Sequence, residues 1–138
     1  MKILIRLLFL FVFLSFVSCK KIIETKQRDL LIDAMTNGQW LVHQYMEVTH
    51  DITAQFDGYH FQFEENGEVH GIKGTASTHG TWEGDINNYS ITSQFPAATD
   101  PVKKLNGTWK LTDSDYDYVK AEMITPGGKN ILHLRKKP

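Results

Sequence analysis

The pattern of apolar and polar residues divides the chain into an apolar start, one short helical stretch and a long alternating region. Residues 7–17 form an almost unbroken apolar run. Between Arg28 and Met35 apolar residues recur at helical spacing, and Asn37-Gly38 is a plausible helix stop. From Trp40 onward apolar and polar residues alternate, with turn residues about every eight to twelve positions. The pattern predicts one short helix followed by β-strands.

Eight strands are expected in the alternating region, over residues 39–49, 59–64, 68–73, 78–84, 89–95, 105–112, 116–124 and 130–136. Most of the links are short and rich in turn formers, such as Asn66-Gly67 and Pro126-Gly127-Gly128. Short links favour antiparallel neighbours, and closure of the sheet removes its exposed edges. We therefore expect an all-β fold: an eight-stranded antiparallel up-and-down β-barrel preceded by one short N-terminal helix.

Alternation within the strands indicates which side chains face the barrel interior. In the first strand the expected inward face carries Trp40, Val42, Gln44, Met46 and Val48. An eight-stranded barrel is either filled by side chains or holds one small ligand. Inward polar positions favour a ligand, since a buried polar group without a partner costs about 1–3 kcal/mol. The candidate ligand-binding residues of the interior are Trp40, Gln44, Phe61, Phe63, Trp82, Ile91, Trp109 and Met123.

The N-terminal segment has the order of a secretory signal: Lys2 and Arg6, the apolar run, then Ser18-Cys19. The run is about half of the roughly 20 residues that a membrane-spanning helix needs. Its end, residues 16–19, resembles the lipobox of bacterial lipoproteins, although Phe16 stands where leucine is usual. We expect a signal peptide over residues 1–18, a tether lipidated on Cys19 over residues 19–27 and the barrel over residues 28–138. The alternative is ordinary secretion with an incidental cysteine.

Composition excludes several classes of function. The chain has 15 Lys and Arg against 16 Asp and Glu; loss of Lys2 and Arg6 leaves 13 against 16, a formal charge of −3. This weak acidity argues against nucleic acid as a partner. The sequence contains no nucleophile elbow, phosphate-binding glycine loop or dinucleotide fingerprint, so we expect neither an enzyme nor a cofactor. Because no acidic run follows Cys19, we expect the protein to face the periplasm from the outer membrane.

The tripeptide Gly-x-Trp occurs three times, at residues 38–40, 80–82 and 107–109. Glycine allows a sharp entry into a strand and tryptophan supplies a large apolar plug, or alternatively an aromatic ligand-binding wall. Together with residues 58–63 (Gly-Tyr-His-Phe-Gln-Phe) and 105–109 (Leu-Asn-Gly-Thr-Trp), the order resembles the lipocalin-like lipoproteins of Bacteroidetes-type envelopes. The resemblance implies a barrel with one open end that contains a small apolar molecule. It also implies a basic residue packed across the first tryptophan, for which Arg135 is the candidate.

The expected function is therefore a lipid-anchored envelope lipoprotein whose barrel binds or carries a small apolar molecule. The alternative is a periplasmic protein-interaction or structural module with a filled barrel, no ligand and a protein partner that the sequence leaves unknown. A carrier needs an interior cavity, whereas an interaction module needs an exposed apolar patch. A weaker alternative is a zinc-type site on three consecutive strands, formed by His60, His70 and His79.

Overall fold

The computed structural model describes residues 20–138. The predicted signal peptide and Cys19 lie outside the described residues. Within residues 20–138, no helix combines the length and the apolar composition that a membrane crossing requires.

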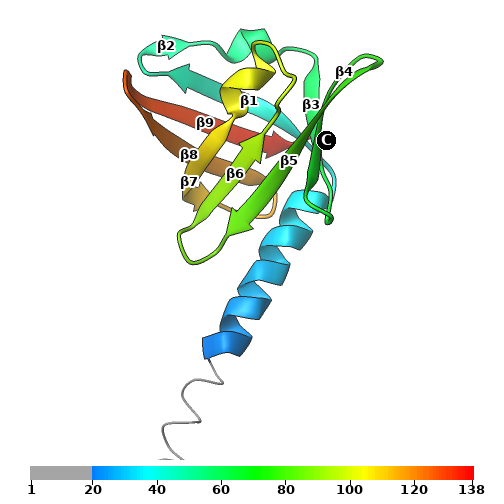
Figure 1. Cartoon of the computed structure of the whole chain (residues 1–138), viewed down its shortest axis with the longest axis vertical. Helices are drawn as coiled ribbons and strands as arrows, with labels where there is room; N and C mark the ends of the chain where they lie inside the picture. Colours follow the sequence, from blue (N-terminus) through cyan, green and yellow to red (C-terminus); the bar gives the residue numbers. More distant parts are fainter. Residues whose placement is uncertain (1–19) are drawn as a thin grey trace, which may run out of the picture.

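The described chain folds into one antiparallel sheet whose ends meet to form a barrel (Figure 1). The strands follow one another around it in chain order, and β1 also pairs with β9. Strand β2 pairs only at the end of β1, so the closed wall has eight strands, as predicted. The strands are β1 (Gln39–Glu47), β2 (His50–Asp51), β3 (Tyr59–Phe63), β4 (Glu68–Lys73), β5 (Ala76–Asp85), β6 (Ser90–Gln94), β7 (Gly107–Ser114), β8 (Tyr118–Thr125) and β9 (Gly128–Lys136).

The two ends of the barrel are built differently. At one end, the long connections contain two short 3-10 helices, η1 (Thr53–Phe56) and η2 (Val102–Leu105). At the other end lie the turns after β3, β5 and β7 and the entry into β1. We call the first the closed end and the second the mouth.

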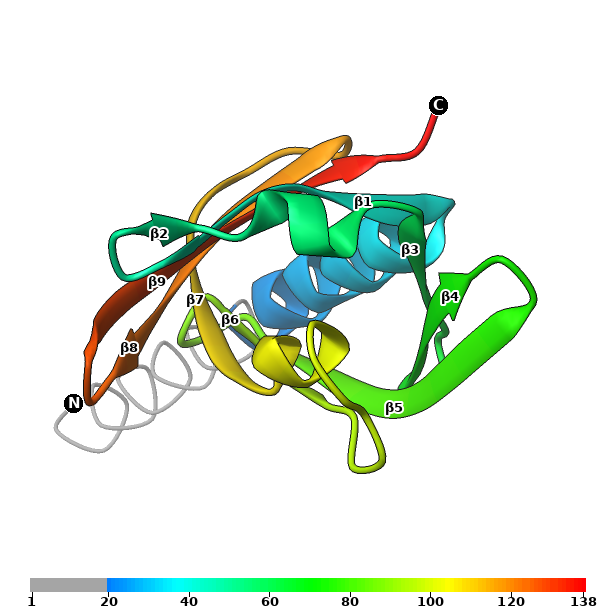
Figure 2. The same cartoon turned by 90° about the horizontal axis from the view of Figure 1, so that it is seen from above.

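The N-terminal helix packs against the mouth. Residues 20–36 are helical, so the helix is longer than the predicted residues 28–35, and the predicted tether is part of it. Its last turns lie against the barrel and its first turns project away from it (Figure 1). Seen from above, it passes behind the barrel between β1 and β5 (Figure 2). Contact with β5 is direct, because a Cβ on Gly84 would lie 2.6 Å from Leu31 Cδ2.

An irregularity in β1 overturns part of the predicted inward face. The pairing of β1 with β9 shifts between Val42 and Gln44, so the alternation changes phase. Tyr45, which pairs with buried Leu132, faces inward and is 1% exposed, while Gln44 pairs with His133 on the outer side. The inward assignment is therefore wrong for Gln44, Met46 and Val48. A single extra residue reverses parity, which residue types alone do not reveal.

The three Gly-x-Trp glycines serve two purposes. Gly38 and Gly107 have φ angles of 92° and 126°, as a sharp entry into a strand requires. Gly80 lies inside β5, where the prediction of a strand entry is wrong. A Cβ there would lie 2.5 Å from the Gln94 carbonyl oxygen and 2.6 Å from Phe95 Cδ1. This glycine therefore allows β6 and its end to approach β5 closely.

Candidate functional site

The barrel interior is filled by side chains. The cavity that remains has a volume of about 40 Å³, enough for at most a few water molecules. Small-molecule sites are typically about 300–1,000 Å³, so this space accommodates no lipid-sized ligand. Its walls are almost entirely apolar and include four of the predicted ligand-binding residues, Phe61, Phe63, Ile91 and Trp109.

The three tryptophans act as anchors, because each indole N–H donates to a backbone carbonyl. Trp40 donates to Met35 (2.9 Å), Trp82 to Glu64 (2.9 Å) and Trp109 to Leu105 (3.0 Å). Trp40 is 0% exposed and thereby ties the end of the helix to β1. These bonds support the plug interpretation, since the polar atom of each ring already has a protein partner.

The inward polar side chains of Ser93 and Asn130 also have protein partners. Ser93 Oγ donates to the Leu105 carbonyl at 2.7 Å. Asn130 Oδ1 accepts from the Val48 N–H at 3.0 Å, and Asn130 Nδ2 lies 3.5 Å from the Tyr45 hydroxyl. The interior therefore needs no ligand to satisfy these groups, which removes the sequence argument for an internal polar ligand head.

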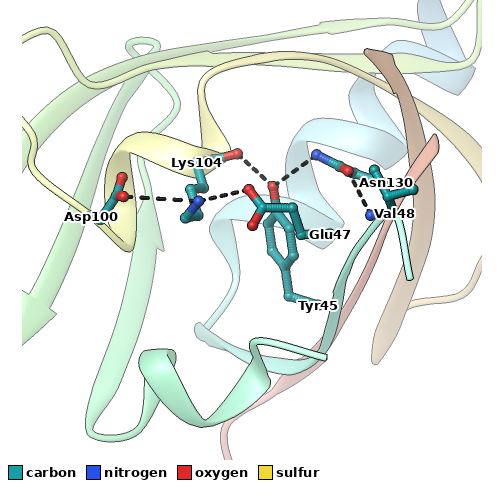
Figure 3. A network of polar contacts seen from close by, with 6 residues as sticks. All are labelled: Tyr45, Glu47, Val48, Asp100, Lys104 and Asn130. Carbon is teal, nitrogen blue, oxygen red and sulfur yellow. Dashed lines mark hydrogen bonds and ion pairs between the residues drawn. The ribbon is translucent and has the colours of Figure 1, made fainter. Parts of the chain in front are cut away.

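A polar network fastens the closed end (Figure 3). The Tyr45 hydroxyl donates to the Lys104 carbonyl at 2.8 Å, and Lys104 Nζ lies 2.6 Å from Glu47 Oε1 and 3.8 Å from Asp100 Oδ2. Burial raises the pKa of Tyr45 to about 12, and the hydrogen bond to Glu47 raises the pKa of Lys104. The network joins β1, β9 and η2, so this end is held shut by residues from three parts of the chain.

An apolar pocket lies at the mouth, where the helix leaves part of the barrel opening uncovered. Its volume is about 290 Å³, close to the lower end of the range for small-molecule sites. One helix face and the turns after β5 and β7 form its walls. This mouth pocket is lined by Gln27, Leu30, Leu31, Ala34, Met35, Trp40, Asp85, Ile86, Tyr89, Leu111, Ser114, Asp115 and Val119.

The charged groups of the mouth pocket are acidic. Its lining includes the residues Asp85 and Asp115 and no lysine, arginine or histidine. Asp85 accepts hydrogen bonds from the Asn88 side chain and from the backbone N–H groups of Asn88 and Asn87, which lower its pKa. Because Asp85 stays ionised, the rim disfavours an anionic ligand and tolerates a neutral or cationic one.

The residues predicted to bind a ligand therefore do not form one site but lie in different parts of the barrel. Trp40 lines the mouth pocket, whereas Trp82 packs edge-on against Phe63 with ring centroids 5.3 Å apart. Met123 is half-buried, and its Sδ lies 2.6 Å from the place of a Cβ on Gly107. Leu30, Leu31 and Ala34 also line the mouth pocket but were not predicted as site residues. Their helical spacing is visible in the sequence, but the sequence does not show which part of the barrel this helix face meets.

The basic residue beside the first tryptophan is Lys136, because Lys136 pairs with Trp40 across β1 and β9. Its Nζ is buried, 5.5 Å from the Trp40 ring centroid and 3.4 Å from that of Tyr116. Arg135 is exposed on the other face, so the assignment of this role to Arg135 is wrong.

Two of the three candidate metal-binding histidines meet on the outer wall. His70 and His79 pair directly across β4 and β5. His60 pairs with Ile72 and is not part of the group. The third residue of the group is Glu68, which was not among the predicted metal ligands.

Comparison with known proteins supports the architecture. No protein-family model matches the sequence, and the search of curated proteins gave no match. The chain is similar to the crystal structure of a DUF4847 family protein from Bacteroides vulgatus, with a TM-score of 0.56 and 13% sequence identity. The two chains share a fold. The match covers 78% of this chain and 99% of the other, so it includes most of the described barrel.

Proposed function

We propose that the protein is a lipid-anchored envelope protein that binds a small, largely apolar molecule in the mouth pocket. The observation that carries the proposal is the apolar space of about 290 Å³ between the helix and the barrel mouth. The acidic rim favours a neutral or cationic molecule over a fatty acid. The proposed ligand site is therefore the mouth pocket. The sequence predicted a ligand inside the barrel, but that interior is filled by side chains.

The position of the helix suits a membrane anchor on Cys19. Residues 20–36 are helical, and the helix first lines the mouth pocket at Gln27, about 12 Å along its axis from a lipid on residue 19. The helix projects from the mouth end (Figure 1), so the mouth pocket would be on the membrane side of the barrel. A molecule leaving the bilayer would reach this pocket first.

The anchor is tested by fractionation of cells that produce Cys19→Ala. Each buried acyl CH₂ contributes about 0.8 kcal/mol, so two or three chains anchor the protein stably. We expect the parent protein to remain in the membrane fraction after a salt wash and the variant to leave it. A variant that stays membrane-bound would show that the anchor is elsewhere.

Ligand binding is tested with three probes that differ in charge: octanol, octylamine and octanoate. The protein used is the chain from residue 19 onward with Cys19→Ser. Binding is measured as a change in tryptophan fluorescence, since Trp40 lines the pocket. We expect saturable binding of octanol and octylamine and at least fivefold weaker binding of octanoate.

A pair of helix variants locates the binding. Ala34→Phe fills the mouth pocket and should abolish the fluorescence response to the probes. Asp33→Phe adds the same ring at an exposed position outside the pocket lining and should keep that response. Equal binding by both variants, or no saturable response to any probe, would contradict the proposal.

A second candidate function, protein interaction, is favoured by apolar side chains that extend from the pocket to the surface. Leu30 is 69% exposed and Tyr89 is 64% exposed, and Ile23 continues the same helix stripe. A photo-crosslinker at position 89 would then give one discrete protein adduct in intact cells, which Leu30→Asp would abolish. Absence of an adduct together with saturable probe binding would leave the small molecule as the occupant.

A further inference from the structure

We propose that Glu68, His70 and His79 form a zinc-type metal site on the outer wall of the barrel. One ligand atom from each side chain can be chosen so that all three lie within 4.8 Å of one another. The two histidine rings lie side by side across β4 and β5, with centroids 5.2 Å apart and ring planes tilted by 49°. Glu68 lies two residues before His70 on the same face of β4, and its Oε2 is 3.9 Å from His70 Nε2. This site is separate from the mouth pocket.

The spacing is close to what a tetrahedral ion requires. Zinc bonds of about 2.0–2.2 Å to nitrogen and oxygen place neighbouring ligand atoms about 3.3–3.6 Å apart. The ligand atoms therefore need to approach by at most about 1.5 Å, and all three side chains are at least partly exposed, which leaves them room to rotate. The backbone positions are fixed by an unbroken antiparallel ladder from Glu68 to Lys73.

The donor set selects the kind of ion. Two neutral imidazoles and one carboxylate suit zinc and its transition-metal neighbours, whereas magnesium and calcium prefer oxygen ligands alone. The cross-strand partners beside the cluster are uncharged: Gln62 is opposite His70 on β3, and Thr81 is opposite Glu68 on β5. Ion binding is therefore not opposed by a lysine or arginine at these pairing positions. Three protein ligands leave the fourth position to water, facing solvent.

Calorimetric titration with zinc chloride tests the proposal. The chain from residue 19 onward contains all of the described fold, and Cys19→Ser removes the one thiolate that would add a ligand. We expect one saturable site per chain and no heat from magnesium chloride. His70→Gln and His79→Gln should each raise the dissociation constant at least tenfold. His60→Gln, a matched histidine outside the cluster, should leave it unchanged.

NMR spectroscopy tests the same site with Glu68, His70 and His79 all in place. On addition of zinc, the imidazole NMR signals of His70 and His79 should shift together, while those of the other histidines stay in place. The proposal is overturned by a lack of saturable binding up to about 1 mM zinc, by equal affinity in His79→Gln and His60→Gln, or by shifts at other histidines.

Discussion

Replacing Tyr45 by phenylalanine should destabilise the protein at neutral pH and lose that effect in strong alkali. Tyr45 is 1% exposed, and its hydroxyl donates to the Lys104 carbonyl at 2.8 Å (Figure 3). Phenylalanine keeps the ring, which stacks on Phe56 with centroids 5.5 Å apart, but leaves the carbonyl without this donor. A buried polar group that loses its partner costs about 1–3 kcal/mol, which is the expected loss at pH 7.

The pH dependence follows from the raised pKa of Tyr45. Burial raises this pKa from 10.0 to about 12, so between these values the folded chain keeps a proton that the unfolded chain has lost. Stability therefore falls as pH rises through this window and is fully present below pH 10. A shift of about two units corresponds to about 2.7 kcal/mol at 1.36 kcal/mol per unit. The phenylalanine variant has no such group and lacks this decline.

Urea unfolding of parent and variant between pH 7 and pH 12 measures the effect. The parent should be more stable by about 1–3 kcal/mol up to pH 9, and the difference should shrink to zero or change sign near pH 12. Lys104 also titrates in this range, but it does so in both proteins, so only their difference is interpreted. Tyr89→Phe, at an exposed position, should follow the parent throughout. A constant difference between Tyr45→Phe and the parent at every pH would refute the reasoning.

Three further substitutions test the packing of the barrel by thermal or urea unfolding. Trp40→Ala should cost about 3–5 kcal/mol, because the side chain is fully buried; an unchanged melting curve would contradict its role as a plug. Gly80→Ala should cost more than Gly71→Ala, because the new Cβ would meet a backbone carbonyl at 2.5 Å in the first case and a ring carbon at 3.0 Å in the second. Lys136→Met should keep or raise stability by about 1 kcal/mol, because burying an ammonium without a hydrogen-bond partner costs several kcal/mol and its cation–π contacts return about 2 kcal/mol each. Exposed Arg135→Met should stay within about 0.5 kcal/mol, and a larger loss for Lys136→Met would show that the aromatic contacts dominate.

Strand positions were predictable because their signals are local. Residues 68–73 were expected as a strand, and β4 has these same bounds. The alternation from Tyr59 to Phe63 likewise predicted β3 and its buried ring positions. Closure also followed from sequence, since short links and eight strands leave few other ways to protect the edges. These inferences needed no knowledge of contacts between distant parts of the chain.

Features that depend on register were not predictable. The shift between Val42 and Gln44 reverses parity within one strand, and nothing in the residue types indicates it. Register also decides which histidines meet: His79 is opposite His70, whereas His60 is opposite Ile72. Glu68 was detectable from its spacing to His70, because residues i and i+2 of a strand share a face.

The contrast between the two barrel ends determines where a function is to be sought. At the closed end, the polar atoms of Tyr45, Lys104 and Glu47 bond to one another. Few polar groups there are therefore free to bind a ligand. At the mouth, the covering element is a helix whose apolar face is only partly buried, with Leu30 69% exposed. The helix meets the backbone of β5 where Leu31 contacts Gly84, and this contact fixes the position of the helix wall of the pocket. A substitution at either residue should therefore change the shape of the mouth pocket and leave the closed end as it is.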